Sequence, residues 1–273
     1  MTKFDTQHGL EVAIRAARTA GALLRENYWK PRTIRDKGTN DLVTESDVAS
    51  EKIISEQLRQ AFPGHRVAGE EGTRIGEGEL TWWIDPLDGT YNFVHAVPRF
   101  SVSIALVAGN SIDGILLGVV YDPMFDELFY ANKGGGAYRQ SGGSPVEQIH
   151  VSTLLRLRDA LVASGFPANL QTSRNNTAEW SAFVPLTQGM ARMGSAALDL
   201  CYVASGRFDI YWEQGLAPWD MCGGILIALE AGARVTEYYG DAFKLTPPSG
   251  LLATNAKLHD DGIRVLSLAR VST

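Results

Sequence analysis

The chain opens with apolar residues at helical spacing. Between residues 7 and 28 they recur three or four positions apart, which predicts an amphipathic helix: Leu10, Ala13, Ile14, Ala17, Ala20, Leu23 and Leu24. A second helix is predicted from about Thr44, because TESD at residues 44–47 has the form of a capping box and apolar residues follow at helical spacing. Residues 35–43, between the two helices, are polar and turn-rich. Both helices are expected to pack on a sheet.

Strand-like runs fill the next part of the chain. TWWID at 81–85 is followed by apolar runs at 100–109, 112–123 and 126–132, separated by turn signals such as Gly109-Asn110 and Asp122-Pro123. Sequential strands joined by short turns predict an antiparallel sheet. The glycine-rich stretch at 132–143 predicts a hairpin or surface loop, since it lacks the lysine-serine ending of a phosphate-binding loop and no helix follows it.

Beyond residue 150 the pattern alternates between strand and helix. Strands are predicted at 159–165, 208–213 and 250–255, and helices at 195–206, from about Trp219 to Ala231, and at the end of the sequence. The fold class expected is therefore mixed, α+β and α/β. An N-terminal α+β half with an antiparallel sheet, residues 1–150, precedes a C-terminal α/β half, residues 151–273. We expect the two halves to form one compact unit.

Composition and charge exclude several classes of protein. The 273 residues are 45% hydrophobic and 21% charged, which is an ordinary globular composition. A net charge of -6 without a lysine or arginine run argues against a general nucleic-acid binder. No apolar stretch reaches the roughly 18 residues of a membrane span and no signal-peptide pattern is present, so a soluble protein with no membrane role is expected. Cys201 and Cys222 have neither metal nor redox spacing, which favours a reducing cytoplasm.

Two acids, Asp85 and Asp88, end the strand in WWIDPLDGTYNF. Pro86 and the Asp88-Gly89 turn direct both carboxylates into one small region. An ordinary turn with solvated acids would explain such a pair in polar surroundings, but here the neighbours are tryptophans, an isoleucine and a phenylalanine. Two carboxylates in an apolar environment repel unless one is protonated or a cation lies between them. A hard divalent cation resolves that conflict.

Further oxygen donors are available elsewhere in the chain. Glu70 lies just before the strand, Asp220 begins an apolar helix, and Thr90 follows the turn. Each has an ordinary explanation, as a solvated turn residue, as an acid stabilised by the helix dipole and as a helix cap respectively. Together they form an all-oxygen set, and no histidine-rich, nucleophilic-serine or dinucleotide motif competes. Such a set suits Mg²⁺, whose usual enzymatic partner is a phosphate ester.

Five ordered motifs resemble the inositol monophosphatase family of Mg²⁺-dependent, lithium-sensitive phosphomonoesterases. They are DLVTESD from 41, GEE from 69, WIDPLDGTYNFVHAVPRFSVSIAL from 83, GSAALDLCYVASGRFDIYWEQG from 194 and PWDMCGGILIALEAGA from 218. The resemblance implies a layered α-β-α-β-α sandwich of the inositol monophosphatase and sugar phosphatase type, two or three Mg²⁺ ions and a homodimer. GTYNFVHAVP resembles the inositol monophosphatase branch in particular.

The resemblance also implies roles for individual residues. The implied metal ligands are Glu70, Asp85, the backbone carbonyl of Leu87, Asp88 and Asp220. Glu70 and Thr90 would orient the attacking water, and Asp47 would accept a hydrogen bond from Thr90, although Asp47 is equally well explained as part of the capping box. The implied substrate contacts are Asp88, Gly89, Thr90, Gly194, Ser195, Ala196, Glu213 and Asp220. The family pattern is not followed at Cys222, Gly223 and Ala217-Pro218. The resemblance therefore does not fix the residues at the edge of the substrate pocket or the substrate preference.

The expected function is hydrolysis of a small-molecule phosphate monoester, myo-inositol 1-phosphate in particular. One alternative is a fructose-1,6-bisphosphatase, or another sugar or nucleotide phosphatase, on the same metal site. That alternative needs a basic residue for a second phosphate, and Arg192, Arg207 and Lys37 are the candidates. Another alternative adds a non-catalytic role in binding a transcription or RNA-processing partner.

Overall fold

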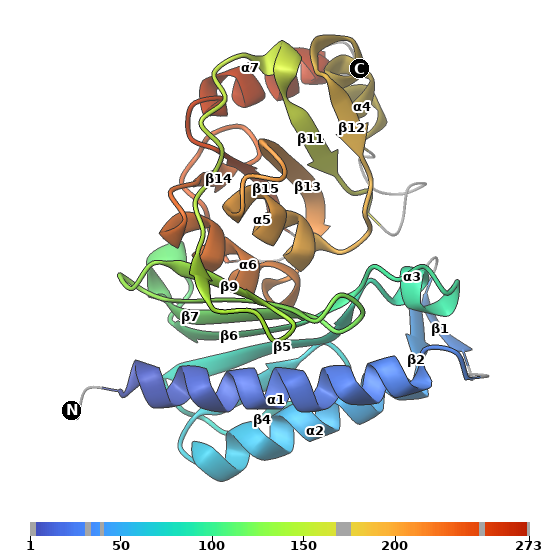
Figure 1. Cartoon of the computed structure of the whole chain (residues 1–273), viewed down its shortest axis with the longest axis vertical. Coiled ribbons are helices and arrows are strands. Elements are labelled where there is room, and N and C mark those ends of the chain that lie inside the picture. Colours follow the sequence, from blue (N-terminus) through green and yellow to red (C-terminus); the bar gives the residue numbers. More distant parts are fainter. Residues whose placement is uncertain (1–3, 31–33, 39–40, 168–175, 246–248, 272–273) are drawn as a thin grey trace.

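The structure is a computed structural model, and it describes residues 4–30, 34–38, 41–167, 176–245 and 249–271. Five layers stack on one another in Figure 1: a helix pair, a large sheet, a second helix pair, a smaller sheet and a last helix pair. The predicted α-β-α-β-α sandwich is confirmed. The helices are α1 (Thr6–Asn27), α2 (Glu45–Ala61), α3 (Thr90–Val94), α4 (Thr177–Phe183), α5 (Ala196–Ala204), α6 (Pro218–Glu230) and α7 (His259–Val271).

The two principal sheets differ in size and direction. In spatial order the larger contains β10 (Glu147–Gln148), β9 (Ala137–Ser141), β8 (Glu127–Asn132), β7 (Ile115–Asp122), β6 (Ser101–Ala108), β5 (Leu80–Asp88), β3 (Arg66–Gly69) and β4 (Arg74–Ile75). The smaller contains β12 (Gly189–Ala191), β11 (Leu161–Ser164), β13 (Ile210–Leu216), β15 (Ser249–Thr254) and β14 (Arg234–Glu237). Strands β5 to β9 pair antiparallel, as predicted, whereas β3 runs parallel to β5.

Two features of the sheets were not predicted. The polar stretch before α2 forms a separate hairpin of β1 (Ile34–Gly38) and β2 (Asp41–Thr44). The smaller sheet is mixed, because β11 is parallel to β12 and β13 while β15 is antiparallel to its neighbours. The strands predicted at 159–165, 208–213 and 250–255 are present as β11, β13 and β15. The hairpin strands of four and five residues are too short to carry a hydrophobic period, and the direction in which two strands pair has no local sequence signal.

Both long N-terminal elements begin as their caps predict. Asp5 accepts hydrogen bonds from the backbone N–H groups of Gln7 and His8 at the start of α1. At the start of α2, Thr44 and Asp47 form a capping box, in which each side chain accepts a hydrogen bond from the backbone N–H of the other residue. The helix predicted over 7–28 and the helix predicted from about Thr44 are therefore confirmed to within a residue.

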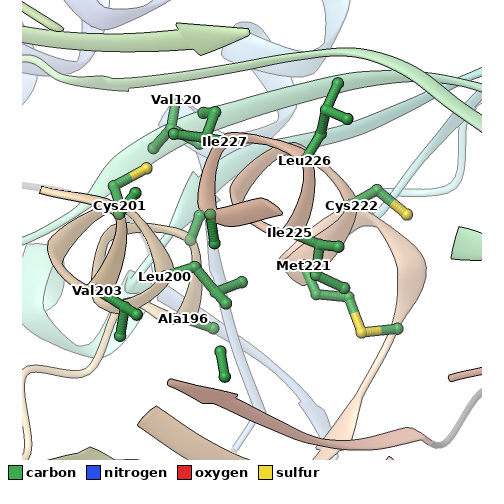
Figure 2. Packing of buried hydrophobic residues seen from close by; sticks show 14 of the residues in the cluster. Val120, Ala196, Leu200, Cys201, Val203, Met221, Cys222, Ile225, Leu226 and Ile227 are labelled. Atoms are coloured by element: carbon green, nitrogen blue, oxygen red, sulfur yellow. The ribbon is translucent and has the colours of Figure 1, made fainter. Parts of the chain in front are cut away.

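The larger sheet has an apolar core on each face. On one face it packs against α1 and α2, and on the other against α5 and α6, which are buried between the two sheets. Figure 2 shows Leu200 of α5, Ile225 of α6 and Val120 of β7 in the second cluster. A helix covered on two sides needs apolar residues all round, which explains the sequences of α5 and α6.

A glycine contact brings α6 onto the larger sheet. A Cβ atom on Gly118 of β7 would lie 2.5 Å from the carbonyl oxygen of Gly223. The backbones therefore approach closely at the first turns of α6, next to Asp220. Gly118 is therefore required by this contact. A Cβ on Gly223, which departs from the family pattern, would lie 2.9 Å from Oγ of Ser103, and Cys222 beside it is a buried free thiol.

Hydrogen bonds cross between residues 1–150 and 151–273. The side-chain amide of Asn92 donates to the carbonyl of Met193 at 2.7 Å, and Ser103 donates to the carbonyl of Trp219 at 3.3 Å. Both bonds lie beside residues that sequence analysis assigned to the site. The division into two halves of one compact unit stays a prediction.

The glycine-rich stretch forms the predicted hairpin, between β8 and β9. The N–H groups of Gly134 and Gly136 donate to the two carboxylate oxygens of Glu230 at 2.6 and 2.8 Å. This loop therefore binds an anion, but the anion is the last side chain of α6. Over the described ranges, no helix combines the length and apolar character needed to cross a bilayer.

Candidate active site

Three acids from distant parts of the chain meet where β3 and β5 of the larger sheet end. One carboxylate oxygen each of Glu70, Asp85 and Asp220 lies within 4.8 Å of the other two. Glu70 follows β3, Asp85 lies in β5, and Asp220 lies in the first turn of α6. The sequence prediction that these three side chains converge agrees with this geometry.

Strand pairing places Glu70 beside Asp85. Because β3 and β5 are parallel, Gly69 pairs with Ile84, and the N–H of Glu70 donates to the Ile84 carbonyl at 3.1 Å. The pairing of β5 with β6 is irregular between Asp85 and Asp88, so both acids lie at a bulge. A bulge redirects side chains at the end of a strand. Here it turns the carboxylate of Asp85 back onto the N–H of Leu87 at 3.0 Å.

The electrostatics of this cluster favour a cation. Burial, together with Glu70, Asp88 and Asp220, raises the pKa of Asp85 well above its usual value. Burial and Glu70 likewise raise the pKa of Asp220 well above its usual value. Both carboxylates would therefore resist ionisation unless a positive charge lay among them. A set of carboxylate oxygens at this spacing has the chemistry of a hard divalent cation site.

Thr90 connects this cluster to α2. Its hydroxyl lies 3.1 Å from Oδ1 of Asp47 and 3.1 Å from the carbonyl oxygen of Leu87, and either oxygen can accept its hydrogen. Oδ2 of Asp47 accepts the backbone N–H and the hydroxyl of Thr44 at 2.8 and 2.6 Å. Asp47 therefore takes part in the helix cap through Oδ2 and lies beside the Thr90 hydroxyl through Oδ1, and its catalytic role stays a prediction.

Thr90 is not the cap of α3. The cap position is Gly89, in the left-handed region with φ 102°, and Thr90 is the first helical residue. Gly89 cannot gain a side chain freely, because a Cβ would lie 3.0 Å from the carbonyl oxygens of Arg99 and Gly194. The backbone of Gly89 is thus fixed between the two halves of the chain.

Asp88 lies next to the three-acid cluster but is not part of it. Its carboxylate accepts hydrogen bonds from the hydroxyl of Ser195 at 2.6 Å and from the N–H groups of Ala196 and Ala197 at 3.1 and 2.8 Å. These groups form the N-terminus of α5, where a negative charge is stabilised. Burial still raises the pKa of Asp88. Its role as a metal ligand stays a prediction, as does that of the Leu87 carbonyl.

A second acidic group lies beyond Asp88. Glu213 of β13 accepts the Tyr211 hydroxyl at 2.5 Å, and burial followed by the charge of Asp88 raises its pKa to about 7. Asp199 of α5 is buried, one of its carboxylate oxygens has no hydrogen-bond partner, and burial, Glu213 and Asp88 raise its pKa well above the usual value. Sequence analysis missed Asp199, although a lone acid in the apolar SAALDLCYVA was a usable signal.

The basic candidates for a second phosphate have different positions. Arg207 donates to both carboxylate oxygens of Glu127 at 2.7 and 2.5 Å and stacks on Tyr202, so its charge is engaged away from the acid cluster. Arg192 lies against Gly194, where a Cβ would be 2.4 Å from Nη1. It also lowers the pKa of Glu213. The side chain of Lys37 lies outside the described part of the structure.

Comparisons with known proteins cover nearly the whole chain. Residues 5–269 match the sequence model of the inositol monophosphatase family. An inositol-1-monophosphatase of Synechocystis sp. is 42% identical over 262 residues, 94% of this chain and 88% of that protein. A Nus factor SuhB of Vibrio cholerae is 44% identical over 238 residues, 85% of each chain. A solved inositol monophosphatase from Anabaena (Nostoc) sp. superposes with a TM-score of 0.85 at 39% identity, covering 97% of each chain.

Proposed function

Because the chain belongs to the inositol monophosphatase family, we propose that this phosphatase hydrolyses inositol 1-phosphate to inositol and phosphate. The observation that carries the proposal is the meeting of Glu70, Asp85 and Asp220 within 4.8 Å. In a family of metal-dependent phosphatases, such a cluster could hold cations, and the cations would let an acidic protein bind an anionic ester.

Glu70, Asp85 and Asp220 would hold Mg²⁺, with Asp88 and the Leu87 carbonyl as further ligands for a total of two or three ions. The bound ions would supply positive charge to the phosphate and acidity to a bound water. The donor set supports this choice, since Mg²⁺ prefers carboxylate and carbonyl oxygens.

The chain's own groups would orient the attacking water. The hydroxyl hydrogen of Thr90 is directed to Asp47 or to the Leu87 carbonyl, so its oxygen is available to accept a hydrogen bond from water. Glu70 would accept the other hydrogen. The backbone N–H groups near Gly89 and Thr90 would donate to the phosphate oxygens. Holding water and phosphate together in this way converts a bimolecular encounter into a directed attack.

The acids beyond Asp88, Glu213 and Asp199, support a polyol as the leaving group. Glu213 would accept hydrogen bonds from hydroxyl groups of the substrate, and at a pH above its pKa of about 7 its charge would repel a second phosphate. Arg192 is the described basic side chain that lowers the pKa of both acids, so it is the residue on which a bisphosphatase activity would depend.

A phosphate-release panel tests this proposal. Purified protein is assayed with inositol 1-phosphate, fructose 1,6-bisphosphate, histidinol phosphate and 3'-phosphoadenosine 5'-phosphate, each with Mg²⁺ and with chelator, and with lithium as inhibitor. We expect the highest kcat/KM with inositol 1-phosphate, no turnover in chelator and inhibition by lithium. A higher kcat/KM with fructose 1,6-bisphosphate would assign the site to a bisphosphatase, and Arg192→Gln would then lose that activity selectively.

The likeness to a protein named Nus factor SuhB supports a second proposed role, the binding of a transcription partner. Co-purification of transcription proteins with the tagged chain from its host tests that role, and Asp220→Asn serves to separate it from catalysis. The predicted homodimer is tested by light scattering during size-exclusion chromatography.

A further inference from the structure

The loop that presents Glu70 is closed and is held from two sides. The N–H of Gly69 donates to the carbonyl of Thr73 at 2.9 Å, which closes the loop. The Arg74 guanidinium donates to the carbonyls of Gly69 and Thr73 and stacks on the Trp219 ring, with 5.2 Å to its centroid. The carbonyl side of the loop is therefore tied to the helix that carries Asp220.

Glu51 of α2 holds the N–H side of the same loop. Its Oε2 accepts the N–H of Glu71 at 2.7 Å, and its Oε1 accepts the N–H of Thr73 at 2.9 Å. The residue is 3% exposed, and in the described structure its hydrogen bonds go to this loop alone. A Cβ atom on Gly69 would lie 2.1 Å from Oε2, so the carboxylate packs directly on the glycine backbone. Hydrogen bonds to a charged acceptor are stronger than neutral ones.

Three side chains on one face of α2 form hydrogen bonds with three separate parts of the site. Asp47 accepts the Thr90 hydroxyl, Ser50 donates to the Pro86 carbonyl at 2.8 Å, and Glu51 binds the Glu70 loop. Residues three and four apart lie on the same side of a helix, which is why all three point to the end of β5. All three are nearly fully buried.

We propose that Glu51 is a positioning residue, which holds Glu70 at the acid cluster against the repulsion of Asp85 and Asp220. This inference rests on the proposed metal-dependent function. Asp85 and Asp220 belong to a strand and a helix, whereas Glu70 lies in a turn, so repulsion would displace Glu70 first. Groups that orient metal ligands in this way affect metal affinity although they do not touch the metal.

The test is Glu51→Gln, examined without substrate. A glutamine has one acceptor oxygen, and its NH₂ group would face a backbone N–H, so one of the two bonds is lost. Calorimetric titration of Mg²⁺ into metal-free protein should give a Kd about tenfold higher than wild type. Amide hydrogen exchange at Glu71 and Thr73 should be faster. Saturating Mg²⁺ should restore kcat, because Glu51 touches no reacting group.

Two further variants make the test specific. Gly69→Ala pushes the Glu51 carboxylate away without removing it and should raise the Mg²⁺ Kd similarly. The Mg²⁺ Kd of the double variant should be no higher than that of the single variant with the lower affinity, because both changes break the same contact. Glu56→Gln is the matched control, since Glu56 lies on α2 but is exposed and forms an ion pair with Lys52 at 4.0 Å; the Mg²⁺ affinity of this variant should equal that of wild type.

Several outcomes would overturn the proposal. Unchanged Mg²⁺ affinity in Glu51→Gln is one, a loss of kcat that saturating Mg²⁺ does not restore is another, and an equal loss in Glu56→Gln is a third. If Glu51→Gln does not fold, Gly69→Ala carries the same measurement. A wild-type protein that binds Mg²⁺ but does not hydrolyse inositol 1-phosphate would refute the proposed substrate and leave this test intact.

Discussion

Replacing Asp85 by asparagine should stabilise the metal-free protein while removing its response to Mg²⁺. The substitution takes one charge out of the cluster with Glu70 and Asp220 and keeps an acceptor for the N–H of Leu87. Asp85 is 2% exposed, so the lost charge is one that water does not solvate in the fold. A group of acids that binds a cation is expected to lower the stability of the fold when no cation is bound.

The magnitude follows from the spacing of the acids. At 4.8 Å and an effective dielectric constant of about 20, each pair of charges repels by about 3 kcal/mol. Asp85 has two such neighbours, but the wild-type cluster relieves part of the repulsion by taking up protons. A net gain of about 1–3 kcal/mol is expected, which for a chain of this size raises Tm by about 2–6 °C.

The gain should depend on pH. The pKa of Asp85 is raised in the folded state, so folded wild-type protein retains this proton to a higher pH than the unfolded chain does. Wild-type stability contributed by Asp85 is therefore greatest below an unfolded pKa of about 4 and is lost as pH rises toward the folded pKa. The advantage of Asp85→Asn in chelator should grow over that interval.

The assay is thermal unfolding in chelator and in Mg²⁺, at about pH 5 and about pH 8. Wild type should gain about 3 kcal/mol at a Mg²⁺ concentration of about a hundred times Kd, whereas Asp85→Asn should gain little. A variant less stable than wild type in chelator, or one that Mg²⁺ stabilises equally, would refute the reasoning.

Three other predictions concern residues outside the three-acid cluster. Thr90→Val should lower kcat by about 10²–10³-fold and Thr90→Ser by less than about tenfold, as measured by phosphate release, because only serine keeps the hydroxyl that meets Asp47; equal losses would exclude a role for the hydroxyl. At about pH 8, above the Glu213 pKa of about 7, Glu213→Gln should raise the kcat/KM ratio of fructose 1,6-bisphosphate to inositol 1-phosphate, since one repelling charge is removed; an unchanged ratio would show that Glu213 does not face the second phosphate. Burial raises the pKa of Asp122 to about 6, so the stability that Asp122 contributes falls as pH rises from about 4 through 6. Asp122→Asn should therefore reduce by about 2 kcal/mol the change in the free energy of unfolding between about pH 4 and 7, as measured by urea unfolding. A pH dependence of the unfolding free energy equal to that of wild type would contradict this assignment.

The sequence predicted those parts of the fold that carry a long pattern or a cap. The helix with seven apolar positions at helical spacing and the capping box at Thr44 have clear local causes, and both helices are present. The hairpin of β1 and β2 was missed, because IRDKG and DLVT are too short to show a period and their pairing depends on the neighbouring strand. The parallel pairing of β3 with β5 also has no local signal.

Some residues of the candidate site could likewise be predicted from the sequence and others could not. Glu70, Asp85 and Asp220 were predicted because their residue type and motifs are visible in the chain, and the structure adds their 4.8 Å spacing. Glu51 was not predicted, because an acid in an amphipathic helix is usually solvated and only its two bonds to the loop after β3 distinguish it. Side chains that act through another residue become visible only when the contact is known.

Anomalous diffraction from crystals soaked in Mn²⁺ tests whether the three acids bind a divalent cation, because it locates the ion without reference to activity. An anomalous peak is expected within coordination distance, about 2 to 2.5 Å, of carboxylate oxygens of Glu70, Asp85 and Asp220. The peak should be lost in Asp85→Asn. Crystals that bind Mn²⁺ elsewhere and show no peak among these three acids would contradict this expectation.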